Sequence, residues 1–209
     1  YAVKDEMHEA TAAREVLVSA GTINSPQLLE LSGIGQAERL RGLGIKVVHE
    51  LKGVGENLRD HYAPRMKWSV PKSLALTYNV KGRGPRVVWE ALKYLFTDKG
   101  LLGITAAPLR AYIRTRAGLE APNAVIGWVP FLVGDNFTLA KESGVTAFMH
   151  IRRSEIRGSI HALSSDAKQA PEIRFNFLSA QLDCDVTIEA MRTARRIMTA
   201  PALDGIVTD

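Results

Sequence analysis

The sequence predicts an α+β fold in which an antiparallel sheet is backed by helices. Three observations point to this class. Short segments rich in β-branched and aromatic residues alternate with period two, as half-buried strands do. Most connections between these segments are too short to hold a crossover helix, which favours antiparallel pairing. A few helical stretches with one apolar face supply the second layer.

The composition is that of a globular protein with a sizeable core. Hydrophobic residues make up 46% and charged residues 23% of the 209 residues, and no apolar run approaches the ~18 residues of a membrane span. The net charge is only +5 and no recognition motif accompanies it, so we expect no nucleic-acid partner. The single cysteine, Cys184, allows no internal disulfide. This indicates a reducing, cytoplasmic compartment.

The first elements are predicted from apolar runs and their punctuation. Residues 15–18 form a β-branched run that ends at a glycine turn, as a strand would. Ser25 and Pro26 then resemble a helix start, with Ser25 as the N-cap and Pro26 at the first helical position. A second short helix is expected at 37–41 and a strand at 45–48.

The pattern changes after Tyr62, where we place a domain boundary. Residues 85–97 predict an amphipathic helix, and 186–199 predict a final helix that Pro201 stops. Between them lie the period-two segments expected to form the sheet: 109–115, 123–131, 144–152, 158–163 and 172–178. The predicted domains are therefore 1–61 and 62–209.

No self-sufficient active site is visible. The five histidines form no close pair at metal-ligand spacing, and one cysteine completes no zinc site. Neither a nucleophile elbow nor a phosphate-binding loop is present. We therefore expect no metal and assign no catalytic residue.

Two segments nevertheless have features that a binding site would use. The turn at 20–26 leads into a helix N-terminus, which suits an anionic ligand, although ordinary helix capping explains the same residues. The glycine-rich loop 53–61 allows Asn57, Asp60 and His61 to converge, although a turn held by side-chain hydrogen bonds is the simpler explanation.

These same segments resemble the glucose–methanol–choline (GMC) flavoprotein oxidoreductases. The fifteen residues from Gly21 to Gly35 are similar to the second signature of that family, and Leu51 to His61 to the loop that follows it. The resemblance continues through later segments, with a choline-dehydrogenase-like character: Pro122–Pro130, Arg153–Gly158, Pro171–Phe177 and Ala194–Leu203.

The resemblance implies FAD as cofactor and assigns parts to the two domains. Residues 1–61 would be the end of a Rossmann-like FAD-binding domain, with Ala20, Gly21 and Ser25 beside the nucleotide. Residues 62–209 would be an incomplete substrate domain. Its predicted pocket residues are Val125, Val129 and Phe131, although plain sheet core explains Val129 and Phe131 equally well.

The departures from the family pattern imply an internal fragment. The sequence lacks the Gly-x-Gly-x-x-Gly fingerprint and the His-Pro motif that carries the family's catalytic histidine. The expected partners are the missing N- and C-terminal parts of the same polypeptide and a small, choline-like alcohol. The alternatives are a non-catalytic remnant or excised module without flavin and, within the same fold, a hydroxynitrile-lyase-like activity.

Overall fold

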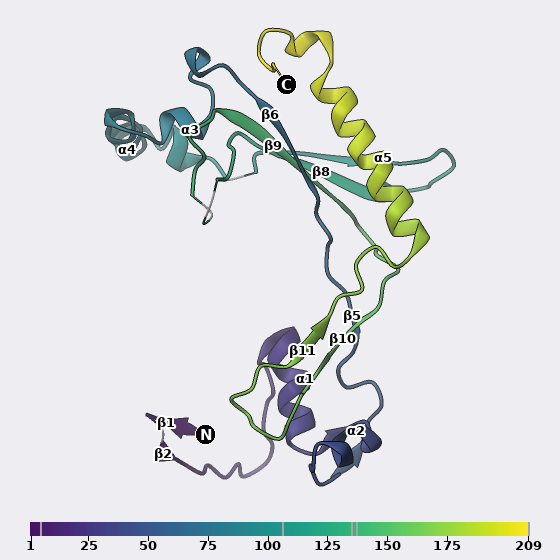
Figure 1. The fold of residues 1–209 in the computed structure, drawn as a ribbon. Coiled ribbons are helices and arrows are strands. Elements are labelled where there is room, and N and C mark those ends of the chain that lie inside the picture. The colour runs from purple at the N-terminus through teal and green to yellow at the C-terminus, as the bar shows by residue number, and fades with distance from the viewer. Residues whose placement is uncertain (5, 106, 135, 137, 209) are drawn as a thin grey trace. The chain divides into compact units, whose positions relative to one another are not determined.

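The computed structural model describes residues 1–4, 6–105, 107–134, 136 and 138–208, and the chain divides into two compact units. Unit 1 combines Tyr1–Arg59 with Arg157–Phe175, and unit 2 combines Asp60–Ile156 with Asn176–Asp209 (Figure 1). Each unit is thus assembled from two separate stretches of chain.

Unit 1 is organised around α1 (Gly21–Leu31) and a three-stranded sheet. The sheet has the order β11-β10-β5, both pairs are antiparallel, and α1 contacts β10. The short strands β3 and β4 form a separate parallel pair next to α1 and α2. The bounds of these elements are β1 Ala2–Val3, β2 Glu6–Met7, β3 Ile34–Gly35, α2 Ala37–Gly42, β4 His49–Glu50, β5 Glu56–Leu58, β10 Gly158–His161 and β11 Glu172–Arg174.

Unit 2 is a four-stranded antiparallel sheet with a long helix on one face. The strand order is β6-β9-β8-β7, and α5 (Gln181–Met198) lies along the sheet and contacts β8 and β9 (Figure 1). The core fills the layer between them: Trp68, Ala124, Ile126, Ala147, Met149, Ile151, Val186, Ala190, Ala194 and Met198. The other elements are β6 Arg65–Ser69, η1 Lys72–Leu74, α3 Tyr78–Lys81, α4 Pro85–Thr97, η2 Leu101–Gly103, β7 Leu109–Ile113, β8 Ala124–Val129, β9 Gly144–Ile151 and η4 Pro201–Leu203.

A buried carboxylate fixes the start of α5. Asp183, in the first turn of this helix, accepts hydrogen bonds from the Ser154 hydroxyl and from the backbone N–H of Glu155 at 3.0 Å. A carboxylate near a helix N-terminus is also favoured by the helix dipole. The segment that follows β9 is thereby tied to the helix that covers the sheet.

Several predictions from the sequence are confirmed. The helix at 85–97 has the predicted bounds, and the final helix ends one residue before the predicted end, although it begins earlier, at Gln181. The strands of unit 2 pair antiparallel as expected, and α5 backs them.

Three local predictions in the first segment are wrong. The strand expected at 45–48 is not formed, and the short strand β4 follows it at His49–Glu50. The run 15–18 is not a strand, and Val16 and Leu17 are 76% and 80% exposed. A strand needs a neighbour for its backbone hydrogen bonds, and no described residue pairs with this run. Ser25 is not an N-cap, because α1 begins four residues earlier, at Gly21. Pro26 therefore lies inside the helix, where it lacks the N–H that would bond to the Thr22 carbonyl.

The division into two compact units also differs from the predicted domains, 1–61 and 62–209, which have a single boundary. Unit 1 also contains Arg157–Phe175, because β10 pairs with β5 and β11 pairs with β10. This stretch includes two of the segments that were predicted to belong to the sheet of the second domain. A period-two pattern shows that a segment is extended, but it does not show which sheet the segment joins.

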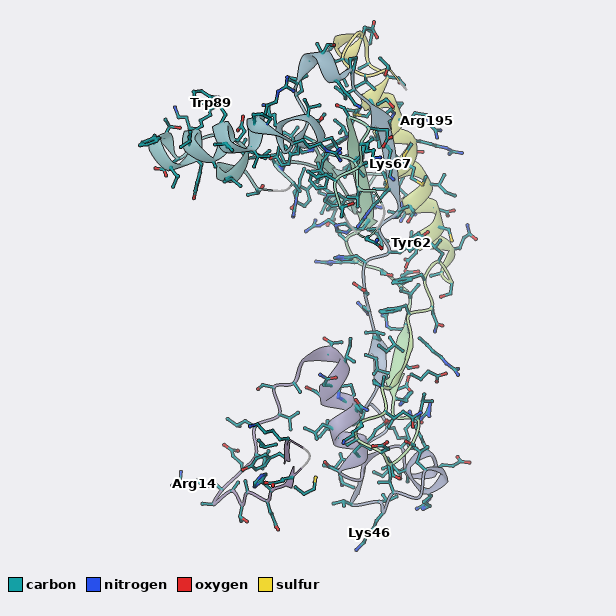
Figure 2. All side chains as sticks on the ribbon, turned by 60° about the vertical axis from the view of Figure 1, so that its left-hand side comes forward. Arg14, Lys46, Tyr62, Lys67, Trp89 and Arg195 are labelled. Carbon is teal, nitrogen blue, oxygen red and sulfur yellow. The ribbon has the colours of Figure 1, made fainter. Side chains whose placement is uncertain are left out.

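The apolar face of α4 is uncovered by the described residues. Val88 and Leu95 are 61% and 73% exposed, and the neighbouring Trp89 projects from the helix as well (Figure 2). Arg195 lies on the solvent side of α5 (Figure 2). Among the described helices, none combines the length and the apolar character that crossing a bilayer requires.

Candidate functional site

The N-terminus of α1 is open and uncapped. Its N-cap residue is Ala20, and no side-chain cap hydrogen bond is formed there by the described residues. Gly21 has a φ of 81°, and a Cβ added there would meet nothing within 4 Å. The free N–H groups of the first turn and the positive end of the helix dipole can therefore face an anionic ligand.

A cavity of about 210 Å³ adjoins this helix start. Thr22 and Pro26 of α1 contribute to its lining, together with Ile160 of β10 and the residues Gly55–Arg59. This loop segment includes the short strand β5. Asn57 in that loop holds a left-handed backbone conformation, with a φ of 61°. The loop thus forms a wall beside the open end of the helix.

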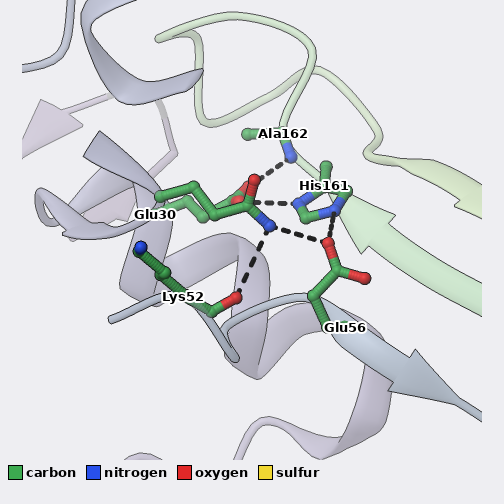
Figure 3. A network of polar contacts seen from close by, with 6 residues as sticks. Glu30, Lys52, Glu56, His161 and Ala162 are labelled. Atoms are coloured by element: carbon green, nitrogen blue, oxygen red, sulfur yellow. Dashed lines mark hydrogen bonds and ion pairs between the residues drawn. The ribbon is translucent and has the colours of Figure 1, made fainter. Parts of the chain in front are cut away.

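A buried polar network holds this loop in place (Figure 3). Glu30, on α1, is fully buried. Its carboxylate accepts a hydrogen bond from the backbone N–H of Ala162 at 2.7 Å and contacts Nδ1 of His161 at 2.8 Å. The other ring nitrogen of His161, Nε2, lies 3.1 Å from a carboxylate oxygen of Glu56. His161 therefore connects α1, through β10, to the loop.

A second contact fixes the loop from the other side. The side-chain amide of Gln36 donates to the same Glu56 oxygen at 2.7 Å, and it lies 3.5 Å from the carbonyl oxygen of Lys52 (Figure 3). Because buried polar groups are costly when unpaired, such a network favours one loop conformation.

Gly55 allows the loop to approach β10 closely. Its φ is 80°, and a Cβ at this position would lie 2.6 Å from Nδ1 of His161 and still closer to the carbonyl oxygen of Ile160. Only glycine fits this backbone conformation and this contact without displacement of the strand.

Unit 2 carries a second, larger cavity of about 630 Å³ on its sheet. Val129 and Phe131 line it, together with Phe148 of β9 and two cationic residues of β6, Arg65 and Lys67. The ring of Phe148 packs onto Gly127, where a Cβ would lie 2.7 Å from its Cε1 atom. This glycine therefore makes room for an aromatic ring on the cavity face.

The structure also brings together two histidines that are far apart in sequence. His61 and His150 stack with ring centroids 4.1 Å apart. Burial lowers the pKa of His150 below its ordinary value of 6.5. The hydrogen bond to the Ile151 carbonyl acts in the opposite direction, and the electrostatic effects of His61 and Arg110 lower the pKa further. No group of three or more metal-ligating side chains occurs in the described ranges.

We expect this histidine to make the stability of unit 2 pH-dependent. Because the pKa of His150 is lower in the folded state, the unfolded state binds a proton more readily. The free energy of unfolding is then highest above pH 6.5 and falls as the pH drops through the folded-state pKa. NMR titration should place the pKa of His150 below 6.5, and Arg110→Gln should raise it. A wild-type titration at or above 6.5 would contradict this prediction.

Comparisons with known proteins show similarity to one family of oxidoreductases. A family model described as GMC oxidoreductase matches residues 2–63. The chain is 38% identical over 196 residues to an oxygen-dependent choline dehydrogenase of Pseudomonas aeruginosa, which covers 93% of this chain and 35% of that relative. A protein of the same name from Xanthomonas campestris is 37% identical over 202 residues, covering 94% of this chain and 35% of that relative. The chain is thus similar to the GMC oxidoreductases, in residues 2–63 to the family model and over most of its length to the two choline dehydrogenases.

Solved structures show the same fold. A formate oxidase variant of Aspergillus oryzae aligns with a TM-score of 0.81 and 23% identity, over 95% of this chain and 39% of that chain. A pyridoxine 4-oxidase aligns with a TM-score of 0.68 and 21% identity, over 90% of this chain and 34% of that chain. The chain thus spans about a third of the length of the curated relatives that it matches.

Enzymes of the GMC family use FAD, and the geometry of unit 1 is compatible with part of this cofactor. FAD carries a pyrophosphate, and an open helix N-terminus with a glycine at its first position accepts such an anion. Of the residues predicted to bind it, Ala20 and Gly21 lie at this exposed end of α1. Ser25 lies about one turn further along the helix and is half-buried.

The predicted pocket residues fall on one sheet of unit 2. Val129 and Phe131 line the larger cavity. Val125 is buried on β8, opposite His150, and is not among the described residues that line this cavity. Asp60 accepts a hydrogen bond from the backbone N–H of the adjacent His61 at 2.7 Å.

Sequence reasoning missed the network formed by Glu30, Glu56 and His161. One signal was available, because Glu30 lies between Leu29 and Leu31 in an apolar run and a charge there needs a buried partner. Its partner could not be identified locally, since His161 lies 131 residues away. Thr22 and Pro26 were also missed as lining residues.

Proposed function

We propose that this chain is the central part of an FAD-dependent oxidoreductase that oxidises the CH–OH group of a small alcohol. The observation that carries the proposal is the open N-terminus of α1 beside the fixed loop Gly55–Arg59, in a chain similar to an FAD-dependent family. The name of the curated relatives makes choline the first alcohol to test.

In this proposal unit 1 holds part of the cofactor. The backbone of Ala20 and Gly21 binds an anionic part of FAD, and Ser25 supports the same turn of the helix. The network around Glu30 and His161 keeps the neighbouring loop in the conformation that leaves the helix end free. We propose that residues 1–61 belong to a Rossmann-like domain, to which Arg157–Phe175 adds strands.

Unit 2 contributes the wall of the substrate pocket. Val129 and Phe131 form apolar parts of the wall, and Val125 supports it from the same strand. FAD, when bound, accepts the hydride of the alcohol carbon. The hydroxyl proton passes to a base that lies outside this chain, so the product is the corresponding carbonyl compound. His61 stacks on His150 and has a structural role. The single cysteine supports a reducing, cytoplasmic compartment.

The cofactor assignment is tested with two variants of matched shape in the full-length protein. Gly21→Asp places a carboxylate at the helix start, where it competes with an anionic ligand, whereas Gly21→Asn has the same shape without the charge. We expect the purified Asp variant to contain less FAD, measured by absorbance at the flavin bands, than the Asn variant. Equal flavin content in the two variants would contradict the assignment.

The same preparations test the activity. We expect anaerobic addition of an alcohol substrate to bleach the flavin absorbance of the wild-type protein. A colourless full-length protein would instead support the alternative of a non-catalytic module.

A further inference from the structure

The cavity of about 630 Å³ in unit 2 has two cationic side chains, Arg65 and Lys67, among apolar and neutral polar lining residues. On β6, Met66 and Trp68 pack towards α5, so the alternating residues Arg65 and Lys67 face the opposite side. The register places Arg65 opposite Phe148 and Lys67 opposite Thr146, both of which line the cavity. The two cations are therefore built into the cavity wall by the strand geometry.

No carboxylate is among the described residues that line this cavity, and Glu142 lines an adjoining cavity that shares Lys67. Lys67 donates to the carbonyl oxygen of Val133 at 3.3 Å, a contact that orients its ammonium group without neutralising it. Arg110 lies on the same sheet face, at the far end of the row that runs from Arg65 through Phe148 and Gly127. A third cation thus adds to the positive potential of this face.

The other lining residues do not attract a cationic ligand strongly enough to offset its repulsion by Arg65 and Lys67. Phe131 and Phe148 can attract an ammonium group through their ring faces. That attraction arises from a quadrupole and decays faster with distance than the repulsion between full charges. Thr146 adds no charge: its hydroxyl is neutral and donates to the Phe131 carbonyl at 2.8 Å.

We propose that the alcohol oxidised at this site carries a carboxylate, bound by Arg65 and Lys67, and that a quaternary ammonium alcohol such as choline is a poor substrate. This substrate class rests on the function proposed above. The carboxylate remains unchanged in the reaction, while the CH–OH group loses a hydride to the flavin and a proton to the base. Charge-assisted hydrogen bonds from a guanidinium and an ammonium suit this group.

Three alcohols of similar size and different charge test the proposal in the full-length flavoenzyme. They are hydroxypivalate with a carboxylate, 3,3-dimethylbutan-1-ol without charge, and choline with a trimethylammonium group. We expect kcat/KM, measured by flavin reduction, to fall in that order. Raised ionic strength should narrow the differences, since salt screens the exposed charges.

Variants of the two cations assign the effect to this cavity. Arg65→Gln and Lys67→Gln should each lower kcat/KM for hydroxypivalate about tenfold, as expected for the loss of one charge-assisted contact. The same variants should leave kcat/KM for the uncharged alcohol nearly unchanged, and Arg65→Lys and Lys67→Arg should recover part of the loss. Lys72→Gln removes an exposed lysine that does not line the cavity, so it should change none of the three values. Flavin content reports whether each variant is folded.

The outcomes separate this proposal from the proposed function. If choline reduces the flavin as well as or better than hydroxypivalate, the substrate class is wrong and the alcohol oxidoreductase assignment stands. An unchanged preference in both Gln variants also overturns the roles of Arg65 and Lys67. If none of a broad set of alcohols reduces the flavin, the proposed function itself fails, and this inference fails with it.

Discussion

Gly55→Ala is expected to destabilise unit 1 by roughly 2–5 kcal/mol, because it combines backbone strain with overpacking. The residue has a φ of 80°, which an alanine adopts only at a cost. The new methyl group would also overlap the Ile160 carbonyl and the ring of His161, and both belong to β10. Since a backbone carbonyl cannot rotate away as a side chain does, β5 and β10 would have to separate.

Gly53→Ala is the matched control for this variant. Gly53 lies two residues earlier in the same loop, and an added Cβ there meets nothing within 4 Å. We expect a change of at most about 0.5 kcal/mol. Hydrogen–deuterium exchange of the amides of residues 157–162 measures both effects, and residues 144–151 of unit 2 serve as an internal reference. Similar exchange in the two variants would contradict the role given to Gly55.

Glu30→Ala is expected to cost about 2–5 kcal/mol, because it truncates a fully buried side chain and leaves buried polar groups without their partner. The substitution leaves the Ala162 N–H and the His161 ring without their acceptor in a buried place. It also leaves a cavity where a fully buried side chain was. Glu30→Gln should cost less, because it keeps the shape and one acceptor oxygen.

Glu38→Ala provides the control for the loss of a carboxylate alone. Glu38 is exposed in the first turn of α2, so its removal should cost less than about 1 kcal/mol. The amides of residues 157–162 should exchange faster in Glu30→Ala and at the wild-type rate in Glu38→Ala. If both variants exchanged at the same rate, the network would not be what holds β10 to α1.

Local sequence patterns predicted the elements of the fold better than their associations. The helix at 85–97 was predicted with the right bounds because Pro85 marks its start and its apolar residues recur with helical spacing. The run 15–18 was mistaken for a strand because its composition is that of a strand, whereas pairing depends on residues elsewhere. The placement of 157–175 failed for the same reason, since β5 and β10 are about a hundred residues apart.

The same distinction between local patterns and the association of distant segments applies to the candidate sites. The helix start at Gly21 and the loop at 53–61 could be found from glycines and turn residues, which act over a few positions. The stacking of His61 on His150 could not be found, because it depends on the pairing of distant segments. The charge of the larger cavity likewise becomes visible only when the register shows which face of β6 is opposite α5.

The interleaving of the two units imposes an order on folding during synthesis. Glu30 leaves the ribosome long before His161, and almost all of the sheet of unit 2 is translated in between. Glu30 therefore lacks the partners that bury it in the folded protein, while β6 to β9 already have their partners. Closing so long a loop costs entropy, and vectorial synthesis adds a delay to that cost. Translation pauses before residue 157 should accordingly prolong the interval in which the nascent N-terminal stretch is open to chaperones and proteases.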